Sequence, residues 1–142
     1  MHVRAILEEK GRNVLTIKPD ATLQDAARVL QENRIGALVV VGLNEQIKGI
    51  LSERDIVSAV ARHGAGALAT TVSSAMTANV HRCTEDMTVD GVMSLMSEKR
   101  CRHLPVETNG RLAGMVSIGD VVKSRIREIE FEAREIKAYI AG

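Results

Sequence analysis

The chain has 142 residues, of which 45% are hydrophobic, and only Phe131 and Tyr139 are aromatic. This length fits one ordinary domain or two very small ones that share a core, and that core must consist of aliphatic residues and methionine. The 19 basic and 18 acidic residues leave a formal net charge of +1. This balance argues against the basic face that general nucleic-acid binding requires.

The cysteines and the hydropathy pattern indicate the compartment. Cys83 and Cys101 are too few for a disulfide framework, and residues 1–12 lack the apolar segment of a secretory signal. No run approaches the roughly 18 apolar residues of a membrane-spanning helix. We therefore expect a soluble cytoplasmic protein with neither a membrane nor a nucleic acid as its partner.

The first half of the chain predicts a strand, a helix, two further strands and a second helix. Thr22 and Ser52 stand at the two helix starts as N-caps, and Gly64 and Gly66 end the second helix. The aliphatic run ALVVV is typical of a buried strand. The expected elements are strand 14–17, a helix through residues 23–30, strands 37–41 and 47–51, and helix 52–62.

The second half repeats this order. We expect strand 80–83, helix 88–99, strands 103–107 and 111–116, and a helix from Ile118. A shift of 66 residues aligns the first strand and helix of the two halves, and a shift of 65 aligns GILSERDIV at 49–57 with GMVSIGDVV at 114–122. The order β-α-β-β-α therefore occurs twice, which predicts an α/β fold.

Each copy resembles a cystathionine-β-synthase (CBS) domain, and the chain is similar to stand-alone bacterial proteins that consist of one CBS pair. The resemblance covers residues from about 10 to 125 and depends most on the doubled phrase Gly, two apolar residues, Ser, two variable residues, Asp. It implies two repeats packed with pseudo-twofold symmetry, with clefts between them that often bind adenine nucleotides. We expect copy one with its lead-in at 1–66, a linker and copy two at 67–125, and a C-terminal helical extension at 126–142.

The Ser and Asp of the doubled phrase have two interpretations. S-x-x-D before an apolar helix is the signature of a capping box, and Thr22 with Asp25 is expected to form a cap alone. The two S-x-x-D phrases, however, follow buried strands, where open α/β sheets place ligands, and a helix N-terminus suits a phosphate. An Asp at this place can also accept hydrogen bonds from a ribose diol, and the family pattern agrees. We therefore favour a nucleotide role over capping alone.

The resemblance also implies which residues line each cleft, with small residues beside adenine and basic residues beside phosphate. The cleft that holds Asp120 is expected to contain Leu15, Ile35, Gly36, Ala37, Arg102, His103, Ser117 and Gly119. The cleft that holds Asp55 is expected to contain Ser52, Arg54, Thr77 and Val80. Lys10 is a weaker candidate, at the place before copy one that roughly corresponds to Thr77.

Two kinds of site chemistry are considered and set aside. Four soft side chains in copy two invite a zinc interpretation, namely His81, Cys83, Cys101 and His103. Their counterparts in copy one are all apolar, which favours packing or cleft positions, and we expect no metal site. Neither cysteine has an evident activating base, and residues 62–71 lack the lysine of a phosphate-binding loop. We therefore expect no enzymatic activity.

The C-terminal segment has an apolar stripe with heptad spacing. Its members are Val122, Ile126, Ile129, Ala133, Ile136 and Ile140. A helix lying along its own domain would account for the first two turns. Beyond the second copy little core is left to cover, so pairing with a second chain is the more natural way to bury the remainder.

Together these features predict a homodimeric, non-catalytic sensor with an adenine nucleotide as its ligand. AMP is the first choice, followed by ADP, ATP or NAD(H), and a downstream protein partner is expected but not identified. The alternative is a structural or adaptor dimer in which the ligand sites are degenerate and the S-x-x-D phrases only cap helices.

Overall fold

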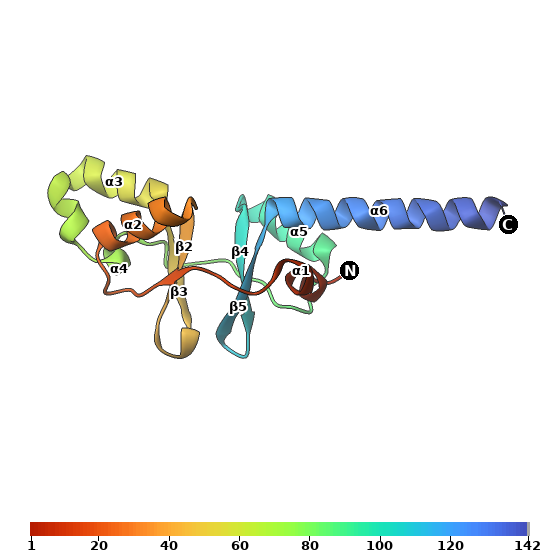
Figure 1. Ribbon diagram of the computed structural model, residues 1–142, viewed down its shortest axis with the longest axis horizontal. Helices are drawn as coiled ribbons and strands as arrows, with labels where there is room; N and C mark the ends of the chain where they lie inside the picture. The colour runs from red at the N-terminus through yellow and green to blue at the C-terminus, as the bar shows by residue number, and fades with distance from the viewer. Residues whose placement is uncertain (142) are drawn as a thin grey trace. The chain divides into compact units, whose positions relative to one another are not determined.

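A computed structural model describes residues 1–141, which form two compact units (Figure 1). The copy-one unit comprises Asn13–Val80 and Asn109–Leu112. The copy-two unit comprises Met1–Arg12, His81–Thr108 and residues 113–141. Each unit has its own cluster of buried aliphatic side chains.

The copy-one unit contains a three-stranded sheet in the order β1-β2-β3, with β1 parallel and β3 antiparallel to β2. Helix α2 buries Leu23, Ala26 and Leu30, which recur at helical spacing, against Leu38 and Leu51 of the sheet. The elements are β1 (Thr16–Ile17), α2 (Leu23–Asn33), β2 (Ala37–Val41), η1 (Leu43–Glu45), β3 (Ile47–Ser52), α3 (Glu53–His63), η2 (Ala65–Ala69) and α4 (Val72–Ala75).

The copy-two unit repeats this arrangement around a two-stranded sheet. Val89, Val92 and Met96 of α5 pack with Leu104 and Val106 in its core. The elements are α1 (Val3–Lys10), α5 (Val89–Lys99), β4 (His103–Thr108), β5 (Arg111–Ser117) and α6 (Ile118–Ala141). The α/β class, the two repeats and the long C-terminal helix predicted from the sequence are confirmed.

The strand expected at residues 80–83 is wrong. Only Cys83 pairs, in an isolated parallel bridge with Val106. This bridge has the register of Ile17 with Val40 in copy one, since both partners are shifted by 66 residues. Pro105 stands in β4 directly before Val106, and because proline has no N–H to donate, the ladder cannot extend back towards residue 80.

Each unit is completed by the segment that precedes the other copy in the chain. In the copy-two unit the Val3 N–H donates to the Met87 carbonyl at 3.0 Å. In the copy-one unit the Val72 N–H makes the equivalent bond to the Ala21 carbonyl at 2.8 Å. The helices that begin at these residues, α1 and α4, therefore have matching places, and α1 is the longer by four residues (eight against four).

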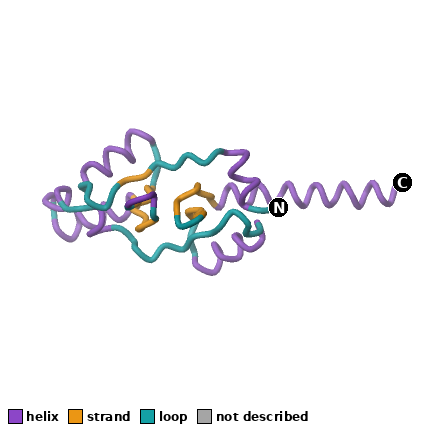
Figure 2. Tube along the Cα trace, turned by 90° about the horizontal axis from the view of Figure 1, so that it is seen from below, coloured by secondary structure: helices purple, strands orange, loops and turns teal. Residues whose placement is uncertain are grey.

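Helix α6 leaves the body of its unit after about three turns. Val121 and Ser124 are buried, whereas every described residue from Ile129 to Ala141 is exposed. Figures 1 and 2 show this part of α6 running beyond α1 and α5 with no other segment of its own unit beside it. Among residues 1–141 no helix combines the length and the apolar character that crossing a bilayer demands.

Candidate functional site

The doubled phrase forms a helix cap in both copies. At the start of α3, the Ser52 Oγ accepts from the Asp55 N–H at 3.2 Å and the Asp55 Oδ2 accepts from the Ser52 N–H at 2.8 Å. At the start of α6 the same two bonds join Ser117 and Asp120, at 3.1 and 2.9 Å. The capping interpretation is therefore confirmed as geometry, and the question becomes what each helix start leaves available to a ligand.

Each start leaves one amide and one carboxylate oxygen available. The first helical N–H, of Glu53 or Ile118, donates to the carbonyl of Gly36 or Arg102, at 2.9 and 2.8 Å. The third N–H is used by the serine, so only the second, of Arg54 or Gly119, lacks an acceptor among residues 1–141. Asp Oδ1 is likewise without a donor in both caps within the described chain, and its two lone pairs can accept two hydroxyl groups.

The main difference between the two helix starts is a lysine, Lys10, which contacts the start of α6. The Lys10 Nζ lies 2.6 Å from Asp120 Oδ2 and donates to the Met115 carbonyl at 3.1 Å. Burial alone would raise the pKa of Asp120, but the hydrogen bonds from Lys10 and from the Ser117 N–H outweigh it and hold this pKa below its ordinary value. The weaker sequence candidate is thus in direct contact with one of the stronger ones.

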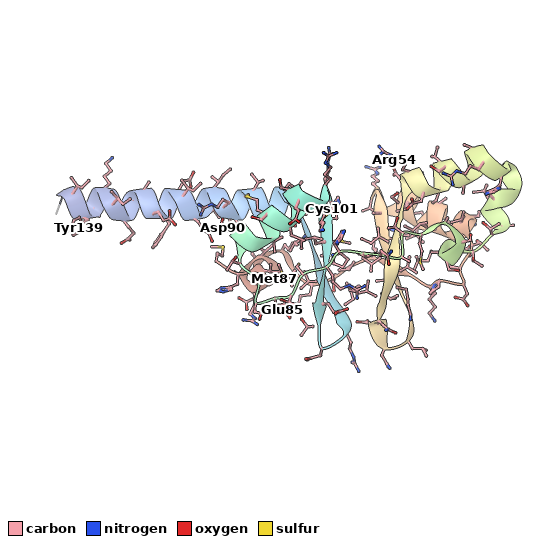
Figure 3. All side chains as sticks on the ribbon, turned by 180° about the vertical axis from the view of Figure 1, so that it is seen from behind. Arg54, Glu85, Met87, Asp90, Cys101 and Tyr139 are labelled. Carbon is pink, nitrogen blue, oxygen red and sulfur yellow. The ribbon has the colours of Figure 1, made fainter. Side chains whose placement is uncertain are left out.

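At the start of α3 the backbone of Thr77 takes the place that the Lys10 side chain has at the start of α6. The Thr77 N–H donates to the Ile50 carbonyl at 2.9 Å, and the Thr77 carbonyl accepts from the Ile50 N–H at 3.0 Å. Ile50 corresponds to Met115 in the repeat, so a lysine side chain in one unit does what a backbone N–H does in the other. Asp55 is half-buried and makes no ion pair within residues 1–141, and Arg54 is exposed beside it (Figure 3).

Some of the remaining residues predicted for the site lie in the copy-one unit, and the others lie in the copy-two unit. In the copy-one unit Ala37 pairs with Ser52 in the β2–β3 ladder, which brings Gly36 and Ala37 to the start of α3. Leu15 is exposed, and Ile35 and Val80 are half-buried. In the copy-two unit Arg102, His103 and Gly119 are all exposed near the start of α6, where Arg102 is bonded through its carbonyl. The copy-two unit thus has three basic side chains at or near this start, those of Lys10, Arg102 and His103.

The glycine of the phrase has a packing role that the sequence did not reveal. A Cβ on Gly49 would lie 2.6 Å from the Thr77 carbonyl oxygen, and one on Gly114 would lie 2.7 Å from Leu7 Cδ2. Both distances are too short for real contacts. The segment that completes each unit therefore lies directly on this glycine, and the signal, a glycine repeated inside a buried strand, indicates close backbone approach.

The four soft side chains of copy two do not gather. Cys83 is 1% exposed in the core, where burial raises the pKa of its thiol to about 12. Cys101 is half-buried, and His81 and His103 are exposed. Among residues 1–141 no group of three or more His, Cys, Asp and Glu side chains is placed to hold a metal ion.

Removal of the Lys10 ammonium is expected to change the acid sensitivity of the fold. Because the pKa of Asp120 is lowered in the folded state, the pair stabilises the fold above about pH 5 and ceases to do so as the pH falls through and below 3.8, the ordinary aspartate value. Lys10→Met should lower the free energy of unfolding at pH 7 by roughly 0.5 kcal/mol. Urea unfolding between pH 3 and 7 should show this difference disappear in acid.

Lys18→Met is the matched control for this measurement, since Lys18 is exposed and makes no ion pair within residues 1–141. It should leave the pH dependence unchanged. A Lys10→Met protein whose loss of stability is the same at pH 3 and pH 7 would show that the ion pair is not formed in solution.

Comparison with known proteins identifies the fold family. The family model described as CBS domain matches residues 3–62 and 72–127. The chain is 34% identical over 145 residues to the mitochondrial CBS domain-containing protein CBSX3 of Arabidopsis thaliana, covering 96% of this chain and 70% of that protein. It spans 60 to 70% of the length of the first three curated relatives that it matches.

Two solved structures are also similar. The CBS-domain containing protein ATU1752 from Agrobacterium tumefaciens is 50% identical, with a TM-score of 0.79 over 87% of this chain and 92% of that one. The CBS domain pair of protein MJ0100, in complex with 5′-methylthioadenosine and S-adenosyl-L-methionine, is 26% identical, with a TM-score of 0.76 over 90% of this chain and 98% of that one. This chain therefore belongs to the CBS domain family, in which it is a tandem pair of CBS repeats followed by a long helix.

Proposed function

We propose that this CBS pair is a non-catalytic regulatory module that binds an adenine nucleotide at the starts of α3 and α6. The observation that carries the proposal is the set of groups that each cap leaves available: one carboxylate oxygen for ribose hydroxyls, one helix N–H, and exposed basic side chains beside them. The adenosine ligands of the MJ0100 pair support the adenosine part of this assignment.

The charges around the start of α6 favour a ligand with a phosphate. Lys10, Arg102 and His103 are basic side chains, of a kind that forms charge-assisted hydrogen bonds with phosphate oxygens. A sulfonium ligand such as S-adenosyl-L-methionine would meet these charges with a positive charge of its own, whereas a phosphate would be attracted. AMP is the smallest of the four candidate ligands, and we place it first, ahead of ADP, ATP and NAD(H).

The direct test is calorimetry on the purified chain with AMP, ADP, ATP, NAD and NADH. Adenosine and guanosine monophosphate serve as controls for the phosphate and for the base. We expect at most two sites per chain, weaker binding of both controls, and a thermal shift, because a ligand at a hundred times its dissociation constant adds ~2.7 kcal/mol of stability. Neither heat nor a thermal shift with any of the five nucleotides would contradict the proposal.

A second function is favoured by the completeness of the caps. The Thr22–Asp25 cap makes the same two bonds as the doubled phrase, at 3.1 and 3.3 Å, outside any predicted site. Capping thus accounts for Ser52, Asp55, Ser117 and Asp120 without a ligand. In that case the protein is an adaptor dimer with degenerate sites, and the same calorimetry decides between the two functions.

We also propose that the module is a homodimer that acts on a downstream protein partner. Its support is a pair of exposed valines at matching places in the second helix of each copy: Val57 is 66% exposed on α3 and Val122 is 40% exposed on α6. Apolar side chains at equivalent helix positions suit a symmetric contact between two chains. The helices of the CBS repeats would form most of that contact, and α6 would reinforce it.

A further inference from the structure

Helix α6 presents an apolar stripe that its own unit does not cover. The stripe members Ile126 and Ile129 are each 50% exposed, and Ile136 and Ile140 are 61% and 78% exposed. With Val122 and Ala133 they follow the a and d positions of a heptad repeat. Phe131 is also exposed but lies outside the stripe, at position f.

Another face of α6 makes the contacts with its own unit. Val121 and Ser124 are buried, and the Glu128 carboxylate pairs with the N-terminal amine of Met1 at 2.8 Å. Beyond Glu128 every residue to Ala141 is exposed, and Figure 3 labels Tyr139 on this projecting part. The stripe therefore has no partner within its own unit.

The charged residues that flank the stripe are complementary to those of a second copy of α6. Arg125 and Glu132 take the g positions, and Glu130 and Lys137 take the e positions. In a parallel, in-register pair, each g residue meets the e residue five places further along the partner helix. Glu132 then meets Lys137 of the partner subunit, and Arg125 meets Glu130 of the partner subunit, so both contacts join opposite charges.

The antiparallel arrangement with full overlap of the stripes brings like charges together. Glu132 would then face Glu132 of the partner subunit, and Glu130 would face Glu130 of the partner subunit. Lys123 would face Lys137 of the partner subunit. Like charges at such positions oppose association, so the charge pattern selects one orientation.

We propose that residues 126–140 of α6 pair in parallel and in register with the same segment of a second copy. The inference rests on the proposed homodimer, because a seam of fewer than three heptads needs the CBS helices to hold the two chains together. It does not depend on ligand binding. In such a dimer the two α6 helices run in the same direction, with their C-terminal ends side by side.

Charge reversal tests the seam at Glu132 and Lys137, neither of which makes an ion pair within residues 1–141. Arg125 is less suitable because it already pairs with Asp90 and Glu128 of its own chain, at 3.2 and 3.1 Å. Glu132→Lys and Lys137→Glu should each raise the dimer dissociation constant about tenfold, because two symmetric contacts change from attraction to repulsion. The double variant E132K/K137E should restore wild-type association.

Two exposed residues outside the stripe supply matched controls. Glu135→Lys makes the same charge change as Glu132→Lys at position c, and Arg134→Glu makes the same change as Lys137→Glu at position b. Sedimentation of the full-length proteins at low salt should show both controls associating like the wild type. Equal weakening by a variant and its control, or a double variant no tighter than the single ones, overturns the proposal.

Orientation is tested by Ile136→Cys at a d position, in a Cys101→Ala background. Cys83 is 1% exposed and does not compete for oxidation. Mild oxidation of the parallel dimer should join the two chains through residue 136, whereas in the antiparallel dimer this residue lies opposite Ile126 and no disulfide forms. A dimer that sediments normally but does not cross-link overturns the parallel seam and leaves the homodimer standing, and a monomer at all concentrations overturns both.

Discussion

Replacement of Asp120 by alanine is expected to weaken adenine-nucleotide binding at the start of α6 by at least about 30-fold, the equivalent of ~2 kcal/mol. The reason is the loss of the Oδ1 acceptor for ribose hydroxyls in a half-buried site. Asp55→Ala should affect only the site at the start of α3. Calorimetric titration of each variant with AMP measures the effect, because two distinguishable sites lose affinity one at a time.

The control variants must distinguish the loss of a ligand contact from the loss of the helix cap. Asp25→Ala removes the same capping carboxylate from α2, away from either site, and should cost about as much stability without any loss of affinity. Asp120→Asn keeps one oxygen for the Ser117 N–H but puts an amide group where ribose needs an acceptor, so it should bind as poorly as Asp120→Ala. If all these variants bind like the wild type, the carboxylates are caps and the adaptor function holds.

Gly49→Ala is expected to lower the free energy of unfolding by about 1–3 kcal/mol, the usual range for overpacking. The added Cβ would lie 2.6 Å from the Thr77 carbonyl oxygen and 2.8 Å from the Met76 sulfur. The Thr77 carbonyl is bonded to the Ile50 N–H, so it cannot withdraw without losing that bond. Urea unfolding followed by circular dichroism measures the change.

The repeat supplies an internal comparison for this substitution. In Gly114→Ala the nearest atom is the end of the Leu7 side chain, at 2.7 Å, which can rotate away, so the loss should be smaller than for Gly49→Ala. Gly66→Ala is the control, because no atom lies within 4 Å of its Cβ position. Equal stability of the Gly49→Ala and Gly66→Ala proteins would mean that residues 76–77 do not pack on β3 in solution.

The sequence alone was sufficient for the features that depend on neighbouring residues. The aliphatic run at 37–41 predicted β2, and the spacing of Leu23, Ala26 and Leu30 predicted the buried face of α2. The S-x-x-D phrases predicted helix starts at Ser52 and Ser117. These signals are reliable because helix periodicity, strand burial and capping act within a few residues.

Residues 1–12 and 67–80 could not be placed in this way. Residues 1–12 were assigned no element from the sequence, although Val3, Ile6 and Leu7 have helical spacing, and in the structure α1 buries these three side chains in the core of the copy-two unit. Chain order associates it with copy one, whereas packing assigns it to copy two. The helical spacing is a local signal, but the unit on which the helix packs is decided by tertiary burial, so this pairing was visible only in the fold.

The same limit applies to the candidate site. The sequence by itself determined that Asp55 and Asp120 stand one turn inside two equivalent helices, since that follows from the repeat. Only the tertiary structure decided that Lys10 lies against Asp120, 110 residues away in the chain. It also decided that Thr77 packs on Gly49 and that Leu7 packs on Gly114. Contacts of this kind depend on which elements the core brings together, and no local pattern of residues encodes that choice.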